Sequence, residues 1–191
     1  MSDVIDIVTY RPERTDKIFV DTNVWFWFTY ASSNEMCNAD APRRYQIEKY
    51  PQFIEKVLDK GATLYHCPLS YSELAHLIET IEYKRYVSKV NHNVSKKEFR
   101  RIPEEREKVL KEIFMAWQGI TSVSECIPSK LDKGFVDDVH NNLNNSILDP
   151  YDAFLCQIMI KEGFSHMLTD DSDFFSTDSI VIYTANNKML N

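Results

Sequence analysis

Short apolar runs alternate with segments of helical periodicity along this chain of 191 residues, and that alternation limits its possible folds more than any other feature. The strand-like runs lie at 17–21, 62–70, 164–169 and 179–184, with a weaker candidate at 120–127. After the second run, Leu74, Ile78 and Ile81 recur at the spacing of one helix face. Strands that alternate with helices indicate an α/β fold, with a central, mostly parallel sheet of four to five strands flanked by helices.

Helices are expected at 24–31, 42–60, 104–117, 131–144 and 149–163. Pro51 is expected to split the second of these segments or to begin its second half. In the last segment, Pro150 suits the first helical position and Gly163 follows the end. We therefore expect a single domain over 1–191, with a helical, partly basic insertion over about 82–145.

The composition is that of a soluble globular protein, with 43% hydrophobic and 27% charged residues. The longest apolar run, at 24–31, is far shorter than the roughly 20 residues that cross a bilayer. The first 17 residues are rich in acids and lack a long apolar stretch, so no secretory signal is expected. The isolated cysteines are predicted to be reduced, mostly buried thiols of a cytoplasmic protein, and they are Cys37, Cys67, Cys126 and Cys156.

Several common catalytic chemistries lack their sequence motifs. The four glycines are not grouped, so neither a P-loop nor a dinucleotide-binding turn is available. No G-x-S-x-G motif occurs, and the five histidines show no zinc-ligand spacing.

Acidic residues lie where an α/β protein gathers its active groups, beyond the carboxyl ends of the strands. Those that follow a strand-like run, or lie on the first turn of the helix that leads to the next strand, are Asp21, Glu73, Asp152, Asp170, Asp171 and Asp173. Each has a structural interpretation as well. Ser70-x-x-Glu73 has the form of a capping box, Asp149-x-x-Asp152 resembles one, and Asp21 suits a turn.

Energetics separates the two interpretations if the acids converge. A helix cap contributes about 1 kcal/mol. Two carboxylates about 4 Å apart repel by about 4 kcal/mol at an effective dielectric of 20. A convergent set therefore requires divalent cations or raised pKa values, and carboxylate oxygens suit Mg²⁺ or Mn²⁺.

Four segments give the chain a family resemblance. They are "IFVDTN" at 18–23, "SYSEL" at 70–74, "YDAFLCQIMIKEG" at 151–163 and "HMLTDDSDF" at 166–174. In this order, the sequence resembles the PIN-domain ribonucleases, the class that includes the VapC toxins of bacterial toxin–antitoxin pairs. The resemblance implies a three-layer α/β fold and hydrolysis of RNA that leaves a 5′-phosphate and a 3′-hydroxyl. It also implies one or two Mg²⁺ or Mn²⁺ ions, a homodimer and a cognate antitoxin.

The resemblance also assigns residues to the site. Its four metal-binding acids fall on Asp21, Glu73, Asp152 and Asp171. Its supporting residues fall on Thr22, Asn23 and Asp173. The T-x-D-x-D-F spacing favours Asp171 as the fourth acid, and the adjacent Asp170 remains an alternative.

The segment 84–108 holds nine Lys or Arg residues and four Glu, a local charge of +5 on a chain with a net charge of −7. Its predicted phosphate contacts are Lys84, Arg85, Lys89, Lys96, Lys97, Arg100 and Arg101. Its predicted stacking residues are Tyr83, Tyr86, His92 and Phe99. The alternative is a solvated helical hairpin with ordinary ion pairs. Trp25 and Trp27 are expected in the core or a dimer contact rather than as a platform for bases.

Two rival functions remain beside the nuclease hypothesis. One is a PIN-like module that binds RNA or protein without cutting. The other is a haloacid-dehalogenase-like phosphatase with Asp21 as nucleophile, which is disfavoured because Asn23 stands where that family has a second Asp.

Overall fold

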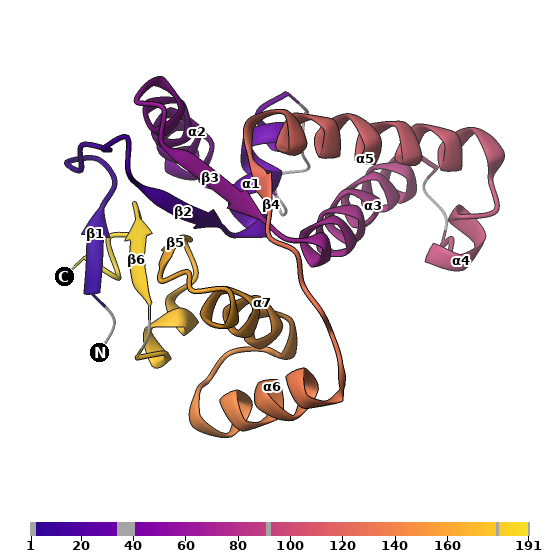
Figure 1. Ribbon diagram of the computed structural model, residues 1–191. Helices are drawn as coiled ribbons and strands as arrows, with labels where there is room; N and C mark the ends of the chain where they lie inside the picture. Colours follow the sequence, from indigo (N-terminus) through magenta and orange to yellow (C-terminus); the bar gives the residue numbers. More distant parts are fainter. Residues whose placement is uncertain (1–2, 34–40, 91–92, 179, 191) are drawn as a thin grey trace.

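The computed structural model describes residues 3–33, 41–90, 93–178 and 180–190. Within them, six strands form one sheet, and they are β1 (Asp3–Asp6), β2 (Lys17–Val20), β3 (Thr63–His66), β4 (Glu125–Cys126), β5 (His166–Leu168) and β6 (Val181–Thr184). Their order is β1-β6-β5-β2-β3-β4, and every neighbouring pair is parallel (Figure 1). The predicted α/β class is confirmed. Strand β1 was not among the strands expected from the sequence, because only Val4 and Ile5 of its residues are apolar.

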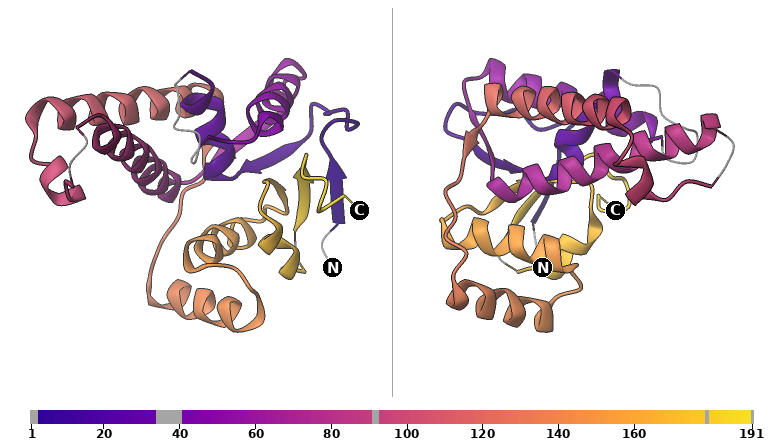
Figure 2. Two further views of the ribbon diagram at one scale, coloured as in Figure 1. Left: turned by 180° about the vertical axis from the view of Figure 1, so that it is seen from behind. Right: turned by 90° about the vertical axis from the view of Figure 1, so that its right-hand side faces the viewer.

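Helices flank the sheet on both faces. In the described ranges they are α1 (Thr22–Thr29), α2 (Arg44–Asp59), α3 (Pro68–Val90), α4 (Lys96–Phe99), α5 (Pro103–Val123), α6 (Lys133–Asn145) and α7 (Pro150–Lys161), with 3₁₀ turns η1 (Ala31–Ser33) and η2 (Ser172–Ser176). Helices α3 and α5 lie side by side and project from the sheet, with α4 at their far end (Figures 1 and 2). None of the described helices combines the length and the apolar character that crossing a membrane requires.

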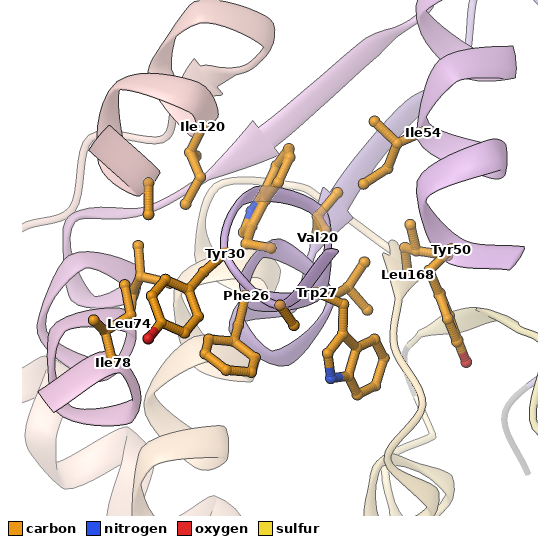
Figure 3. Close-up of a cluster of buried hydrophobic side chains, with 14 of the residues drawn as sticks. Val20, Phe26, Trp27, Tyr30, Tyr50, Ile54, Leu74, Ile78, Ile120 and Leu168 are labelled. Atoms are coloured by element: carbon orange, nitrogen blue, oxygen red, sulfur yellow. The ribbon is translucent and has the colours of Figure 1, made fainter. Parts of the chain in front are cut away.

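Alternate residues of the central strands enter two separate hydrophobic cores. Val20, Leu168 and Tyr183 pack with α1, α2, α3 and α5 on one face of the sheet (Figure 3). Phe19 and Met167, one position earlier on their strands, pack with α6 and α7 on the other. Successive side chains of a strand point to opposite faces. The expected three layers are therefore present, as helices, sheet and helices.

The strand order changes direction beside β2. From β2 the chain proceeds outward to β3 and β4, and it then returns through α6 and α7 to form β5 and β6 on the other side of β2. Ligands of open α/β sheets bind at such a switch point, beyond the carboxyl ends of the strands. The junction between β2 and β5 is therefore where a site is expected.

Two sequence predictions are wrong in detail. Pro51 does not split its segment, since α2 continues through it and buries Tyr50, Phe53 and Ile54 on both sides of the proline. The strand predicted over 120–127 is reduced to two residues, because α5 extends to Val123 and buries Ile120 in the core. The middle segment is thus not wholly helical, since β4 pairs with β3.

The cysteines of the described residues, Cys67, Cys126 and Cys156, are free thiols. Cys67 and Cys156 are buried, whereas Cys126 is exposed. Cys37 lies outside the described residues.

Candidate acidic active site

The ends of β2 and β5 are joined through Asp21. This residue follows β2 directly, and its backbone N–H donates to the Leu168 carbonyl at 3.0 Å. Its carboxylate oxygen Oδ2 accepts a hydrogen bond from Thr169 Oγ1 at 2.8 Å. Asp21 is only 1% exposed. The residue therefore lies at the switch point of the sheet, with a buried carboxylate held from one side.

Asp171 is held beside Asp21 by the same threonine. Its backbone N–H donates to Thr169 Oγ1 at 3.0 Å, and its Oδ1 accepts from the backbone N–H of Asp173 at 2.8 Å. The predicted support from Asp173 thus comes from its amide. Both carboxylates line a pocket of about 280 Å³, together with Asn23.

Asp152 reaches the site from the first turn of α7. Asp149 caps that helix, since its Oδ1 accepts from the backbone N–H of Tyr151 at 2.7 Å and of Asp152 at 2.9 Å. The structural interpretation is thus confirmed for Asp149. For Glu73 the capping-box interpretation is wrong, because α3 begins at Pro68 and places Glu73 inside the helix.

The pKa values of these acids are raised by burial and by the negative charges of their neighbours. The pKa of Asp21 is raised to about 6 by burial and by the charge of Asp171. Burial and the charge of Asp21 raise the pKa of Glu73 to about 7. The pKa of Asp152 is raised to about 8 by burial and by the charges of Asp21, Asp149, Asp171 and Glu73. Burial also raises the pKa of Asp171. The four predicted acids are therefore near enough for their charges to disfavour one another's ionisation, although of the four only Asp21 and Asp171 line the pocket.

The site also concentrates the unpaired buried polar atoms of the protein. Among the described residues, four buried side-chain nitrogen or oxygen atoms lack a hydrogen-bond partner. Three of them are Asp21 Oδ1, Thr22 Oγ1 and Glu73 Oε2, and the fourth is the indole nitrogen of Trp25. A buried polar group without a partner costs about 1–3 kcal/mol. Three oxygen acceptors left open at one place form a donor set that a hard cation would satisfy.

The acids are not drawn together as a closed metal site. In the part of the chain that the structure describes, no group of three or more His, Cys, Asp or Glu side chains is arranged to hold a metal ion. Carboxylates repel one another when no cation lies between them. The residue types and the open oxygens fit Mg²⁺ or Mn²⁺, and binding would require the side chains to move closer.

Asp170 has a structural role that distinguishes it from Asp171. Its carboxylate accepts hydrogen bonds from Tyr50 Oη at 2.6 Å, Gln46 Nε2 at 2.7 Å and Tyr45 Oη at 2.9 Å. These donors fix α2 to the end of β5. Asp171, whose charge acts on Asp21 and Asp152, is the better fourth acid of the site.

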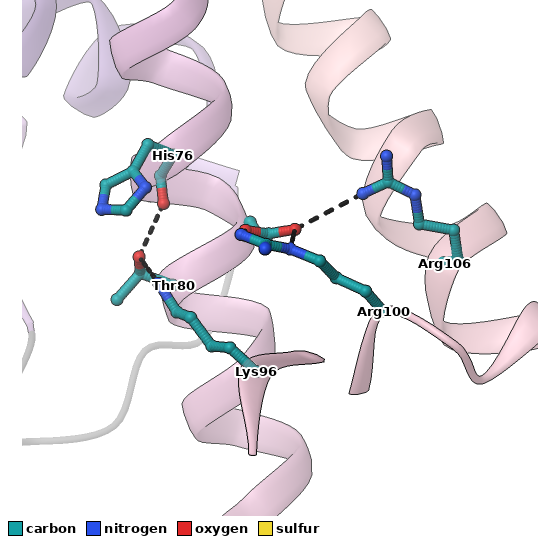
Figure 4. A network of polar contacts seen from close by, with 6 residues as sticks. His76, Thr80, Lys96, Arg100 and Arg106 are labelled. Atoms are coloured by element: carbon teal, nitrogen blue, oxygen red, sulfur yellow. Dashed lines mark hydrogen bonds and ion pairs between the residues drawn. The ribbon is translucent and has the colours of Figure 1, made fainter. Parts of the chain in front are cut away.

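Part of the predicted basic surface is engaged within the protein (Figure 4). Arg100 donates to the carboxylate of Glu79, a buried residue, through Nε at 2.8 Å and Nη2 at 2.5 Å. Arg85 Nη1 donates at 2.6 Å to Glu82, which is 1% exposed. Lys96 Nζ donates to Thr80 Oγ1 at 2.7 Å. The contacts of Arg85 and Arg100 support the ion-paired hairpin interpretation, and Lys96 is engaged by a neutral hydroxyl. The other members of the predicted set, Lys84, Lys89, Lys97 and Arg101, are exposed, and so is Arg100.

The predicted stacking residues pack on one another instead. The rings of Tyr83 and Tyr86 contact Phe99, with centroids 5.7 and 5.4 Å apart, and Phe99 is buried. His92 lies outside the described residues. Trp25 is fully buried in the core, as expected.

Sequence reasoning missed the roles of Thr169 and of the residues that hold Asp170. The threonine is part of the T-x-D motif, so its position was visible although its bond to Asp21 was not. Tyr45, Gln46 and Tyr50 are more than 100 residues away from Asp170 in the sequence, and no local pattern connects them.

No protein-family model matches this chain, and no curated protein sequence matches it. The function of this protein is therefore inferred from its residues and their geometry.

Proposed function

We propose that this protein is an endoribonuclease that hydrolyses RNA phosphodiester bonds with the help of Mg²⁺ or Mn²⁺. Asp21, Glu73, Asp152 and Asp171 would hold the cation. The family resemblance supports this proposal through the order and spacing of these acids.

The observation that carries the proposal is the set of unpaired, buried oxygens at the switch point. Protons could relieve the repulsion among the acids, but they leave Asp21 Oδ1 and Glu73 Oε2 buried without a hydrogen bond of good geometry, with the nearby Thr22 as their neighbour. A bound cation would satisfy both oxygens and offset the charge of all four carboxylates. Folding alone gives no reason to retain such an arrangement.

The residues of the site would have different roles in binding the metal. Thr169 orients Asp21 by donating to Oδ2, which leaves Oδ1 directed to the ligand. The amide of Asp173 orients Asp171 through Oδ1. Asp152, with a pKa of about 8, holds a proton at neutral pH until that proton is displaced. When bound, the metal would lower the pKa of a water molecule and balance charge on the scissile phosphate.

The test is RNA cleavage by the purified protein with MgCl₂ or MnCl₂. We expect cutting of single-stranded RNA that is abolished by EDTA and by Asp21→Asn or Asp152→Asn. Asp59→Asn is a matched control, because this exposed acid lies at the end of α2. Equal activity of the site variants, or activity in EDTA, would contradict the proposal.

A second candidate is a module that binds RNA or a protein without cutting it. The lack of a closed metal cluster among the described residues favours it. Calorimetric titration with MnCl₂ separates the two functions, since a non-catalytic module needs no metal binding at the acids. The proposal extends, by resemblance alone, to a homodimer and to a toxin with a cognate antitoxin. Growth arrest of bacteria that express the protein, relieved by Asp21→Asn, would test the toxin role.

A further inference from the structure

A second hollow adjoins the acidic pocket and shares a wall with it. This hollow, of about 340 Å³, lies between α1 and α3. Asn23 and Trp27 line both the hollow and the acidic pocket. A ligand that occupies the acidic pocket can therefore extend past Trp27 into the hollow without leaving the surface.

The lining of the hollow is aromatic and apolar inside and basic at its rim. Phe26 and Trp27 lie next to each other on the same side of α1 (Figure 3), and Leu77 adds apolar surface from α3. His76 and Lys84 also line the hollow, and both are exposed. An aromatic floor with a basic rim complements a planar base attached to a phosphate.

Two polar groups of the hollow are available to a ligand. Trp27 is largely buried, with 8% of its surface exposed. Among the described residues, its indole N–H donates to no hydrogen-bond partner. The imidazole of His76 likewise has no partner in the described ranges. Its ring is directed away from the ion pair between Arg100 and Glu79 (Figure 4). Donors of this kind can bind the edge of a base while the rings contact its face.

A basic hollow also adjoins the acidic pocket. This hollow, of about 170 Å³, is lined by Arg43, Lys49 and Lys188, together with Tyr45. Tyr45 donates to Asp170, which lines the acidic pocket, so this hollow also adjoins the acids. The acidic pocket thus adjoins both an aromatic hollow and a basic one, and basic side chains near the acids suit the phosphates of a bound strand.

We propose that the hollow between α1 and α3 binds one unpaired nucleobase next to the scissile phosphate. This inference rests on the proposed nuclease function and adds a subsite to it. Trp27 and His76 contact the base, and Lys84 approaches the adjoining phosphate.

The experiment uses a single-stranded RNA of twelve nucleotides whose cleavage position has been mapped with the wild-type protein. A series of such RNAs carries one abasic nucleotide at each successive position around the cut. We expect one position next to the cut to lower kcat/KM roughly tenfold to a hundredfold, because the stacking of one base contributes on that scale. His76→Ala should reduce this abasic penalty at least threefold and leave the other positions unchanged.

His140→Ala is the matched control, since this exposed histidine lies on α6, on the other face of the sheet. A penalty that is equal at all positions, or that His76→Ala leaves intact, would overturn the inference while the nuclease function stands. If no RNA is cleaved, the proposed function fails. Fluorescence anisotropy with the same RNAs, labelled, then tests the subsite by binding alone. The subsite is supported if one abasic position alone weakens binding and His76→Ala makes that loss of affinity smaller. Equal binding of all the abasic RNAs excludes it.

Discussion

The sharpest consequence of the acidic site is that removal of one buried charge should stabilise the metal-free protein. Asp21→Asn keeps the shape of the side chain and retains an oxygen that can accept from Thr169. In most buried positions, loss of a charged group that has a hydrogen-bond partner destabilises a protein. At Asp21 the carboxylate has no cationic partner, and the charge of Asp171 opposes it.

The magnitude follows from the pKa of Asp21, which burial raises from 3.8 to about 6. One pH unit corresponds to about 1.4 kcal/mol, so the ionised carboxylate weakens the fold by about 3 kcal/mol at pH 8. Because the folded pKa lies above the unfolded one, the contribution of this acid is fully present below pH 3.8 and is lost as pH rises to about 6. The asparagine amide leaves an unpaired N–H that costs about 1–2 kcal/mol. The net gain at pH 8 is therefore about 1–2 kcal/mol.

The measurement is urea unfolding in EDTA at pH 8 and at pH 4.5. We expect Asp21→Asn to be more stable than the wild type at pH 8 and no more stable at pH 4.5, where the wild-type acid is protonated. Asp59→Asn, at an exposed position, should change neither value appreciably. Excess MgCl₂ should stabilise the wild type and not the Asp21 variant. Destabilisation of equal size at both pH values would refute the reasoning.

Three further outcomes are expected. The carboxyl group of Asp152, with a pKa of about 8, must lose its proton to bind a metal, so the Mn²⁺ affinity measured by calorimetry should rise from pH 6 to pH 8. The released proton should make the measured heat depend on the buffer. Binding that does not change with pH would exclude this acid as a ligand. Glu82→Gln should lower the free energy of unfolding by about 2 kcal/mol in urea titrations, since it removes the buried carboxylate that accepts from Tyr30, Arg85 and Lys108. The exposed Glu107→Gln is its control, and a similar small loss in both variants would contradict the role of the buried ion pairs. Thr169→Val should reduce RNA cleavage about 10–100-fold, because Asp21 loses its orienting hydrogen bond, and unchanged cleavage kinetics would show that the bond is dispensable.

The sequence predicted the fold class because its signals are local. A run such as "KIFV" is apolar throughout, as a strand covered on both faces must be, and the helices carry apolar residues at their own period. The signals fail where packing outweighs local preference. Helix α2 passes through Pro51 because its buried side chains on either side hold it in the core, and β1 exists because β6 offers it an edge.

The four acids of the site could be identified from their spacing, but their consequences could not. The sequence alone established that acids follow the strands and resemble a known family in order. Only the tertiary structure decided that Asp171 faces the other carboxylates while Asp170 binds α2, because two adjacent residues differ in the direction of their side chains and in the distant groups they meet. It also decided that Arg85 and Arg100 are paired with acids from the neighbouring turns of the hairpin, and that Trp27 lies between two hollows. The physical reason is the same in each case: chemical type is a property of one residue, whereas burial, pairing and charge repulsion depend on parts of the chain that meet only after folding.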